Sequence, residues 1–208
     1  EVFPENFKVT YAFASMPARY ALERKDWAAA AKLEPYTANF SWDKYSWERS
    51  NINFARLLGD VHIGDIAAAK RELSELQTNY DNLVRANENY QANLVLVQAL
   101  SGEGWIHLKE GNEKSGITRM REAADLEDNT SKHPVTPGEL IPARELLADM
   151  YLEVKDYKNA LIAYEADLLR HPNRLNGLQG ALVAAEKTGN PKKTDYKELM
   201  KALTQVAE

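Results

Sequence analysis

Histidines and paired carboxylates are the side chains of this sequence best suited to metal or acid–base chemistry. The histidines stand far apart in the sequence, and none has a second histidine four residues away on the same helix face; they are His62, His107, His133 and His171. His62 and His171 fall at predicted helix C-termini, where an imidazole can bond the last free carbonyl groups. We therefore expect no metal and no cofactor. A metal site assembled by the fold is the alternative.

Glu145 and Asp149 are four residues apart, so a helix would place both carboxylates on one face. An acid–base pair has this spacing, but so does any solvated helix face. We favour recognition, with Arg144 neutralising one carboxylate. The sequence has no His-Glu-x-x-His pattern, no phosphate-binding glycine loop, no glycine-flanked serine and no dinucleotide fingerprint. We therefore expect that the protein is not an enzyme.

Composition narrows the classes of partner. The 26 basic and 31 acidic residues are dispersed and give a net charge of -5, which provides no positive field for nucleic acid. Cysteine is absent, so disulfides and thiolate sites are excluded, and the compartment stays open between cytoplasm and periplasm. No apolar run reaches the roughly 18 residues of a membrane span. The chain begins at Glu1 without a methionine or a signal segment, and we expect it to be a piece of a larger protein.

Five similar junctions divide the chain into helix pairs. In each, a Gly or Lys suited to a left-handed turn precedes an Asp or Asn suited to capping the next helix. The junctions are Lys25-Asp26, Gly64-Asp65, Gly111-Asn112, Lys155-Asp156 and Gly189-Asn190. Because helix-favouring residues dominate throughout, we predict an all-α fold of about five antiparallel helix pairs with irregular insertions. The predicted pairs cover about 12–34, 50–80, 88–127, 141–171 and 175–206 of a single domain, 1–208.

The predicted first helix of each pair begins at Met16, Ile52, Asn89, Ala143 or Leu175, and the second helices include 65–79 and 192–206. Small residues recur at one position of the second helices, namely Ala30, Ala69, Gly116 and Ala160. Around the fourth junction the pattern resembles a tetratricopeptide repeat over its 34-residue length. The residues that carry this resemblance are Leu147, Ala148, Tyr151, Ala160, Tyr164, Ala166 and Pro172.

Three longer segments resemble the C-terminal half of a group of uncharacterised bacterial tetratricopeptide proteins. They are 17–31, 64–70 and 133–147, the last of which reads His-Pro-Val-Thr-Pro-Gly-Glu-Leu-Ile-Pro-Ala-Arg-Glu-Leu-Leu. The resemblance implies a helical solenoid that is part of a longer chain, and it implies no reaction. It also draws attention to the loop that begins at His133.

In solenoids of this class the first helix of each pair lines a concave groove. Carried across the repeats, that register predicts a partner-binding face made of Asn53, Arg56, Ser101, Trp105, Glu145, Asp149, Asn176 and Gln179. Trp105 would be its anchor, since buried aromatic rings dominate binding energies. The alternative is that Trp105 is buried between repeats. His107, beside it, faces either the core or the groove.

Three functions compete at this stage. The first is a scaffold that binds a protein or peptide in the groove. The second is the accessory half of an enzyme or small-ligand sensor, with a pocket formed by the loop from His133 to Glu139 together with Trp105, Arg144 and Glu145. The third is a structural segment or homodimer, favoured if Phe3, Phe7, Tyr11 and Phe13 form an exposed apolar patch. The aromatic segment from Pro35 to Ser46 is expected to be a loop whose rings pack on neighbouring helices.

Overall fold

The computed structural model describes residues 6–36, 40–131 and 138–205. These described residues form ten α-helices and one short 3-10 helix and contain no β-strand, which confirms the all-α class. The chain divides into two compact units, one ending at Ile141 and the other beginning at Pro142. Each unit has its own core.

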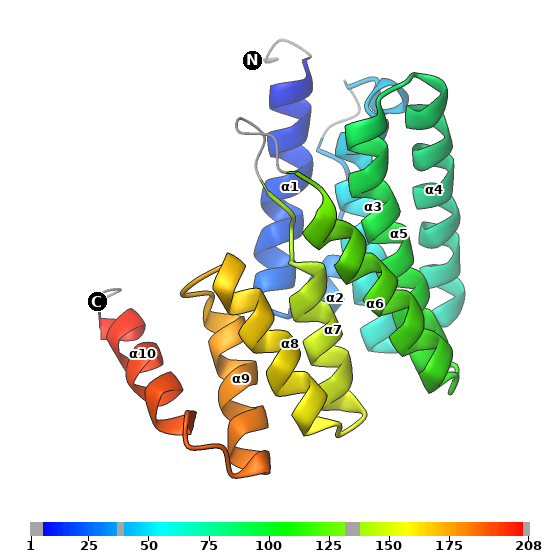
Figure 1. Cartoon of the computed structure of the whole chain (residues 1–208). Helices are drawn as coiled ribbons and strands as arrows, with labels where there is room; N and C mark the ends of the chain where they lie inside the picture. The colour runs from blue at the N-terminus through cyan, green and yellow to red at the C-terminus, as the bar shows by residue number, and fades with distance from the viewer. Residues whose placement is uncertain (1–5, 37–39, 132–137, 206–208) are drawn as a thin grey trace. The chain divides into compact units, whose positions relative to one another are not determined.

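Figure 1 labels the helices in chain order. The first unit contains α1 (Phe7–Glu23), α2 (Trp27–Ala31), the 3-10 helix η1 (Trp42–Lys44), α3 (Ser46–Ile63), α4 (Ile66–Arg85), α5 (Asn89–Lys109) and α6 (Glu113–Asn129). The second unit contains α7 (Ala143–Glu153), α8 (Tyr157–Arg170), α9 (Leu175–Thr188) and α10 (Lys193–Gln205). Within each unit consecutive α-helices pack on one another, and α3, α5 and α9 each pack on both helices of the pair before them.

The predicted turns are confirmed by the backbone. All five junction residues have left-handed φ angles, which are 52° at Lys25, 89° at Gly64, 84° at Gly111, 63° at Lys155 and 69° at Gly189. In each turn the amide of the following residue donates to a carbonyl five positions earlier, as from Asp156 to Tyr151 at 2.9 Å. These bonds satisfy the free carbonyls of the ending helix.

Capping side chains begin most of the following helices as expected. The Asp26, Asp65 and Asp156 carboxylates each accept a hydrogen bond from an amide three residues on. Asn112 is an exception, since its side chain makes no such bond. Two further left-handed turns, at Asn87 and Asn173, were not among the predicted junctions.

Helix α1 begins nine residues earlier than predicted, at Phe7 instead of Met16, and runs through Pro17. The Asn6 side chain caps its start, with Oδ1 accepting from the amides of Lys8 at 3.0 Å and Val9 at 3.2 Å. The added turns pack on α3, where the Tyr11 ring lies 4.7 Å from that of Trp47. Tertiary packing therefore outweighs the cost of a proline inside the helix.

The rings of the aromatic segment pack as predicted. Phe40 is buried, and Tyr36 stacks on Phe13 of α1 with 4.2 Å between ring centroids. Helix α3 then begins at Ser46, six residues before its predicted start, and α4 extends to Arg85. The proposed apolar patch is not continuous, because Tyr11 is buried while Phe7 is half exposed, and Phe3 lies outside the described residues.

Small residues let the helices approach closely. A β-carbon on Gly104 of α5 would lie 3.0 Å from the Gly116 carbonyl oxygen of α6, and Ala30, Ala69 and Ala160 are fully buried. Around these crossings, large side chains fill the two cores; they include Leu57, Leu58, Leu76, Val95 and Met120 in the first unit and Met150, Tyr164 and Leu178 in the second. All four tryptophans belong to the first unit.

In the second unit, the contact between Gly180 and the Tyr164 ring leaves no room for an added methyl group, so such a group should destabilise the fold. A β-carbon on Gly180 of α9 would overlap the phenol ring of Tyr164. Gly180→Ala should therefore lower the free energy of unfolding by about 1–3 kcal/mol, although alanine favours helices. Urea unfolding measures this loss. The control is Gly138→Ala, where the added carbon meets nothing within 4 Å; an equal loss in both variants would contradict the packing explanation.

Candidate functional site

The predicted groove residues of α3 form an internal polar network. Asn53 is 3% exposed, and its amide nitrogen donates to a Glu72 carboxylate oxygen of α4 at 2.7 Å. Asn79, also on α4, donates to the Asn53 amide oxygen at 3.2 Å. Arg56 pairs with Glu34 at 2.8 Å and lies 3.7 Å from Glu72. The predicted role of Asn53 in partner binding is corrected, because the α3–α4 contact already uses its side chain.

Burial also corrects the predicted anchor on α5. Trp105 is 2% exposed, and its ring lies 4.7 Å from that of His62 on α3. His62 in turn stacks on Trp27 at 3.9 Å, and its Nδ1 lies 2.7 Å from the Leu58 carbonyl oxygen, the terminal role predicted for it. Ser101 is fully buried, and its hydroxyl donates to the Val97 carbonyl. Neither Trp105 nor Ser101 offers a surface to a partner.

In the second unit the predicted carboxylates hold three helices together. Glu145 is 1% exposed, and both its oxygens accept from the Arg174 guanidinium, at 2.8 and 2.9 Å. Burial raises the pKa of Glu145, and Arg174 opposes that rise. Asp149 accepts the hydroxyl hydrogen of buried Tyr164, whose pKa is raised by burial and by the Asp149 charge. The shared face of Glu145 and Asp149 is therefore directed toward α8 and the start of α9, with Glu145 buried and Asp149 half-buried.

A third buried carboxylate lies on α8. One Asp167 oxygen is 2.8 Å from the His171 Nδ1, while the other is buried and has no hydrogen-bond partner among the described residues. His171 was predicted to bond a terminal carbonyl, and it pairs with this carboxylate instead. The Tyr164–Asp149 and Arg174–Glu145 contacts join α7 to α8 and to the start of α9, whereas the Asp167–His171 pair lies within α8 and its C-terminal cap. Breaking any of these contacts would leave a charge without its partner inside the unit.

The remaining predicted residues lie in different parts of the chain. Asn176 is half-buried and Gln179 is exposed on α9, and Arg144 is half-buried at the start of α7. The Glu139 carbonyl accepts from Arg19 of α1 at 2.9 Å. His133 lies outside the described residues.

An open groove lies between the last two helices of the first unit. In that unit α3 packs against both α1 and α2, and α5 packs against both α3 and α4. Among the described helices of the unit, α6 packs substantially on α5 alone. The α5–α6 groove therefore corresponds to the grooves that hold a helix elsewhere in the unit, and none of the described helices of the unit fills it.

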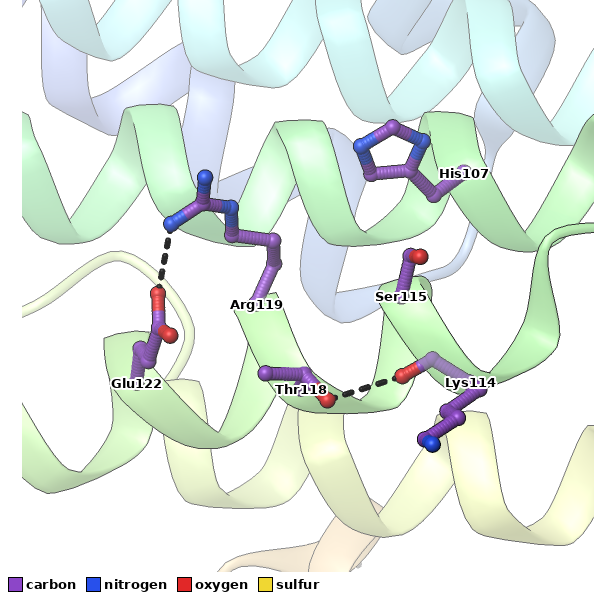
Figure 2. Close-up of a pocket in the computed structure, with 6 residues that line it drawn as sticks. All are labelled: His107, Lys114, Ser115, Thr118, Arg119 and Glu122. Atoms are coloured by element: carbon purple, nitrogen blue, oxygen red, sulfur yellow. Dashed lines mark hydrogen bonds and ion pairs between the residues drawn. The ribbon is translucent and has the colours of Figure 1, made fainter.

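This α5–α6 groove is about 540 Å³ in volume and polar. Its lining residues are His107 on α5 and Lys114, Ser115, Thr118, Arg119 and Glu122 on α6. Figure 2 shows Arg119 reaching from α6 toward α5, with Ser115 and His107 further along the same space. Gly104 of α5 and Gly116 of α6, which are near these lining residues in the sequence, bring the two helices into close contact.

Ion pairs organise the charges of the groove. Arg119 lies 3.2 Å from a Glu103 oxygen of α5 and 2.8 Å from a Glu122 oxygen, and these carboxylates raise its pKa. His107 lies 3.6 Å from the same Glu103 oxygen. The Glu103, Arg119 and Glu122 group has a net negative charge, whereas exposed Lys114 adds a positive charge at the other end. The groove can thus recognise a surface that carries charges of both signs.

The sequence-based register missed this groove because it assigned binding to first helices. One signal was present in the sequence, namely the four-residue spacing of Lys114, Thr118 and Glu122 on one face of α6. A polar helix face is common, however, and only the packing shows that this one borders an unfilled groove.

Comparison of the chain with protein-family models, curated proteins and solved structures finds no match. The described residues include no cluster of three or more side chains suited to holding a metal ion. Within the same part of the chain, no helix is long and apolar enough to cross a membrane.

Buried carboxylates also occur in the first unit. Glu48 of α3 is 4% exposed, and burial, with a smaller effect of Glu88, raises its pKa to about 7. Burial raises the pKa of Asp60 to about 6, and the Glu72 and Asp65 charges add to that rise. Both groups favour protonation in the folded state.

The Glu48 shift predicts that stability decreases with pH. Because the folded pKa exceeds the unfolded value, Glu48 contributes most below about pH 4.5, and this contribution is lost as the pH rises through about 7. The full effect is about 3 kcal/mol, the equivalent of that pKa change. Unfolding by urea at pH 5 and pH 8 should show the decrease, and Glu48→Gln should reduce it. Exposed Glu113→Gln should not; an equal reduction would contradict the assignment.

The Glu145–Arg174 pair predicts a second pH-dependent effect. Arg174→Met leaves the Glu145 carboxylate buried without its partner, so the free energy of unfolding at pH 7 should fall by about 3–5 kcal/mol. The loss should shrink at lower pH, where Glu145 becomes neutral. Exposed Arg170→Met is the matched control and should have little effect. A loss that stays constant with pH would contradict the charge explanation.

Proposed function

We propose that this protein is a non-catalytic interaction scaffold whose α5–α6 groove binds a helix of a protein partner. The observation that carries the proposal is the way in which the helices of the first unit pack on the pairs that precede them. Each earlier pair of helices holds a further helix in its groove, and the α5–α6 pair holds none from its own unit. A helix is therefore the shape of ligand that this groove fits best.

The polar lining supports a protein partner that binds reversibly, since a polar groove is stable in contact with water when the partner is absent. Glu122, Lys114 and Thr118 are exposed, and a permanent core contact would be lined by apolar side chains instead. The groove charges are paired with each other through Arg119, so they are stable in water without a partner. Binding then adds contacts without first exposing buried apolar surface.

We further propose that the chain is a divergent tetratricopeptide-like solenoid. Gly104 and Gly116 are separated by the same number of residues as Ala148 and Ala160, and each pair stands at the small-residue positions of its two helices. The left-handed turns between helices also support this assignment.

Site-specific cross-linking tests the proposed groove. A photoreactive benzoylphenylalanine replaces Thr118 in the groove or Ile162, which is 65% exposed on α8. In the source cells, we expect a discrete cross-linked protein from position 118 only, with the linkage mapping to a helical segment. Adding Arg119→Glu should abolish it, because three carboxylates would then face the partner.

Circular dichroism should show that Arg119→Glu remains folded, since the Arg119 side chain is 43% exposed. Equal cross-linking from positions 118 and 162, or none from position 118, would contradict the proposed groove.

A further inference from the structure

We infer that the helix bound in the α5–α6 groove is α6 of a second copy of this chain, packed antiparallel about a two-fold axis near Thr118. This inference rests on the proposed function and names the partner. It arises from the order of charges along α6. When a second α6 lies antiparallel to the first, the positive end of each helix faces the negative end of the other.

Lys114, Thr118 and Glu122 form a stripe along α6, because residues four apart lie on one helix face. All three are exposed. Lys114 and Glu122 stand about 12 Å apart along the helix axis at 1.5 Å per residue, on either side of Thr118. A two-fold axis at Thr118 therefore places Lys114 of each copy opposite Glu122 of the other. Such a contact forms twice, as two-fold symmetry requires.

The existing ion pairs leave both charges able to make this contact. Glu122 bonds Arg119 through one oxygen, Oε2, so Oε1 remains for a lysine. Lys114 forms no ion pair within the described part of the chain. Because Arg119 also pairs with Glu103, it stays neutralised when Glu122 turns partly toward the second copy.

The shape of the groove suits this arrangement. Ser115 and Thr118 are short side chains on the face of α6 that borders the groove. An α6 helix entering from a second copy would contact α6 and α5 together, and the symmetric partner would do the same. The result is a four-helix bundle of α5 and α6 from two copies.

The chemistry of the contact sets its strength. Exposed ion pairs are screened by salt, so the dimer should weaken as salt is added. This behaviour separates it from an apolar dimer, which salt would not weaken.

Sedimentation equilibrium of the whole chain at low salt tests the inference. We expect a monomer–dimer equilibrium that shifts toward monomer in high salt. Lys114→Glu or Glu122→Lys should each raise the dissociation constant by about tenfold or more, because like charges then face each other twice. The double variant Lys114→Glu/Glu122→Lys should restore the dimer, since the reversed charges are again complementary.

Lys158→Glu on α8 is the control, because it changes the net charge as Lys114→Glu does at another exposed site. It should leave the dissociation constant unchanged. A chain that stays monomeric at low salt, or a double variant that dimerises no better than the single ones, would overturn the inference. In that case a different protein cross-linked to position 118 would still support the proposed function, so the two failures are distinguishable.

Discussion

The fold depends on helices that cross almost backbone to backbone. Gly104 and Gly116 bring α5 and α6 together, and Gly180 admits the Tyr164 ring against α9. At the Gly104–Gly116 crossing the backbones of α5 and α6 are in close contact, and at Gly180 the missing β-carbon leaves room for the Tyr164 ring. Residues near the Gly104–Gly116 crossing in the sequence, His107 of α5 and Ser115 and Thr118 of α6, line the α5–α6 groove.

Polar groups inside the two units add specificity to this packing. The Asn53–Glu72 contact joins α3 to α4, and the Glu145–Arg174 contact joins α7 to the start of α9. Each contact forms only when its two helices are correctly oriented. A buried pair of this kind contributes little net stability compared with apolar packing, but it penalises every arrangement that separates its members. Residues that look available for recognition in the sequence are therefore used to hold the molecule together.

Local chemistry accounts for what the sequence predicted well. The turns at Gly64 and Lys155 depend only on neighbouring residues, and their left-handed geometry was anticipated. Asn87 and Asn173 adopt the same geometry without the Gly or Lys that marked the other turns, so they were missed. The extent of α1 through Pro17 depends on packing against α3, which no local pattern contains.

The site was harder to predict for the same reason. A register carried across irregular repeats assigned Trp105 to a surface, whereas contact with His62 places it inside. Whether a helix face is buried depends on which neighbour covers it, and this is a property of the whole unit. The polar stripe on α6 could be read in the sequence, but its unfilled groove could not.

The placement of the tryptophans makes the two units optically distinct. Every indole belongs to the first unit, and two of them, Trp27 and Trp105, contact the His62 imidazole between them. Tryptophan emission therefore reports on the first unit alone, whereas helical dichroism reports on both. Transitions that coincide in the two signals would mean that the units unfold as one cooperative body, and separated transitions would give each unit its own free energy of unfolding.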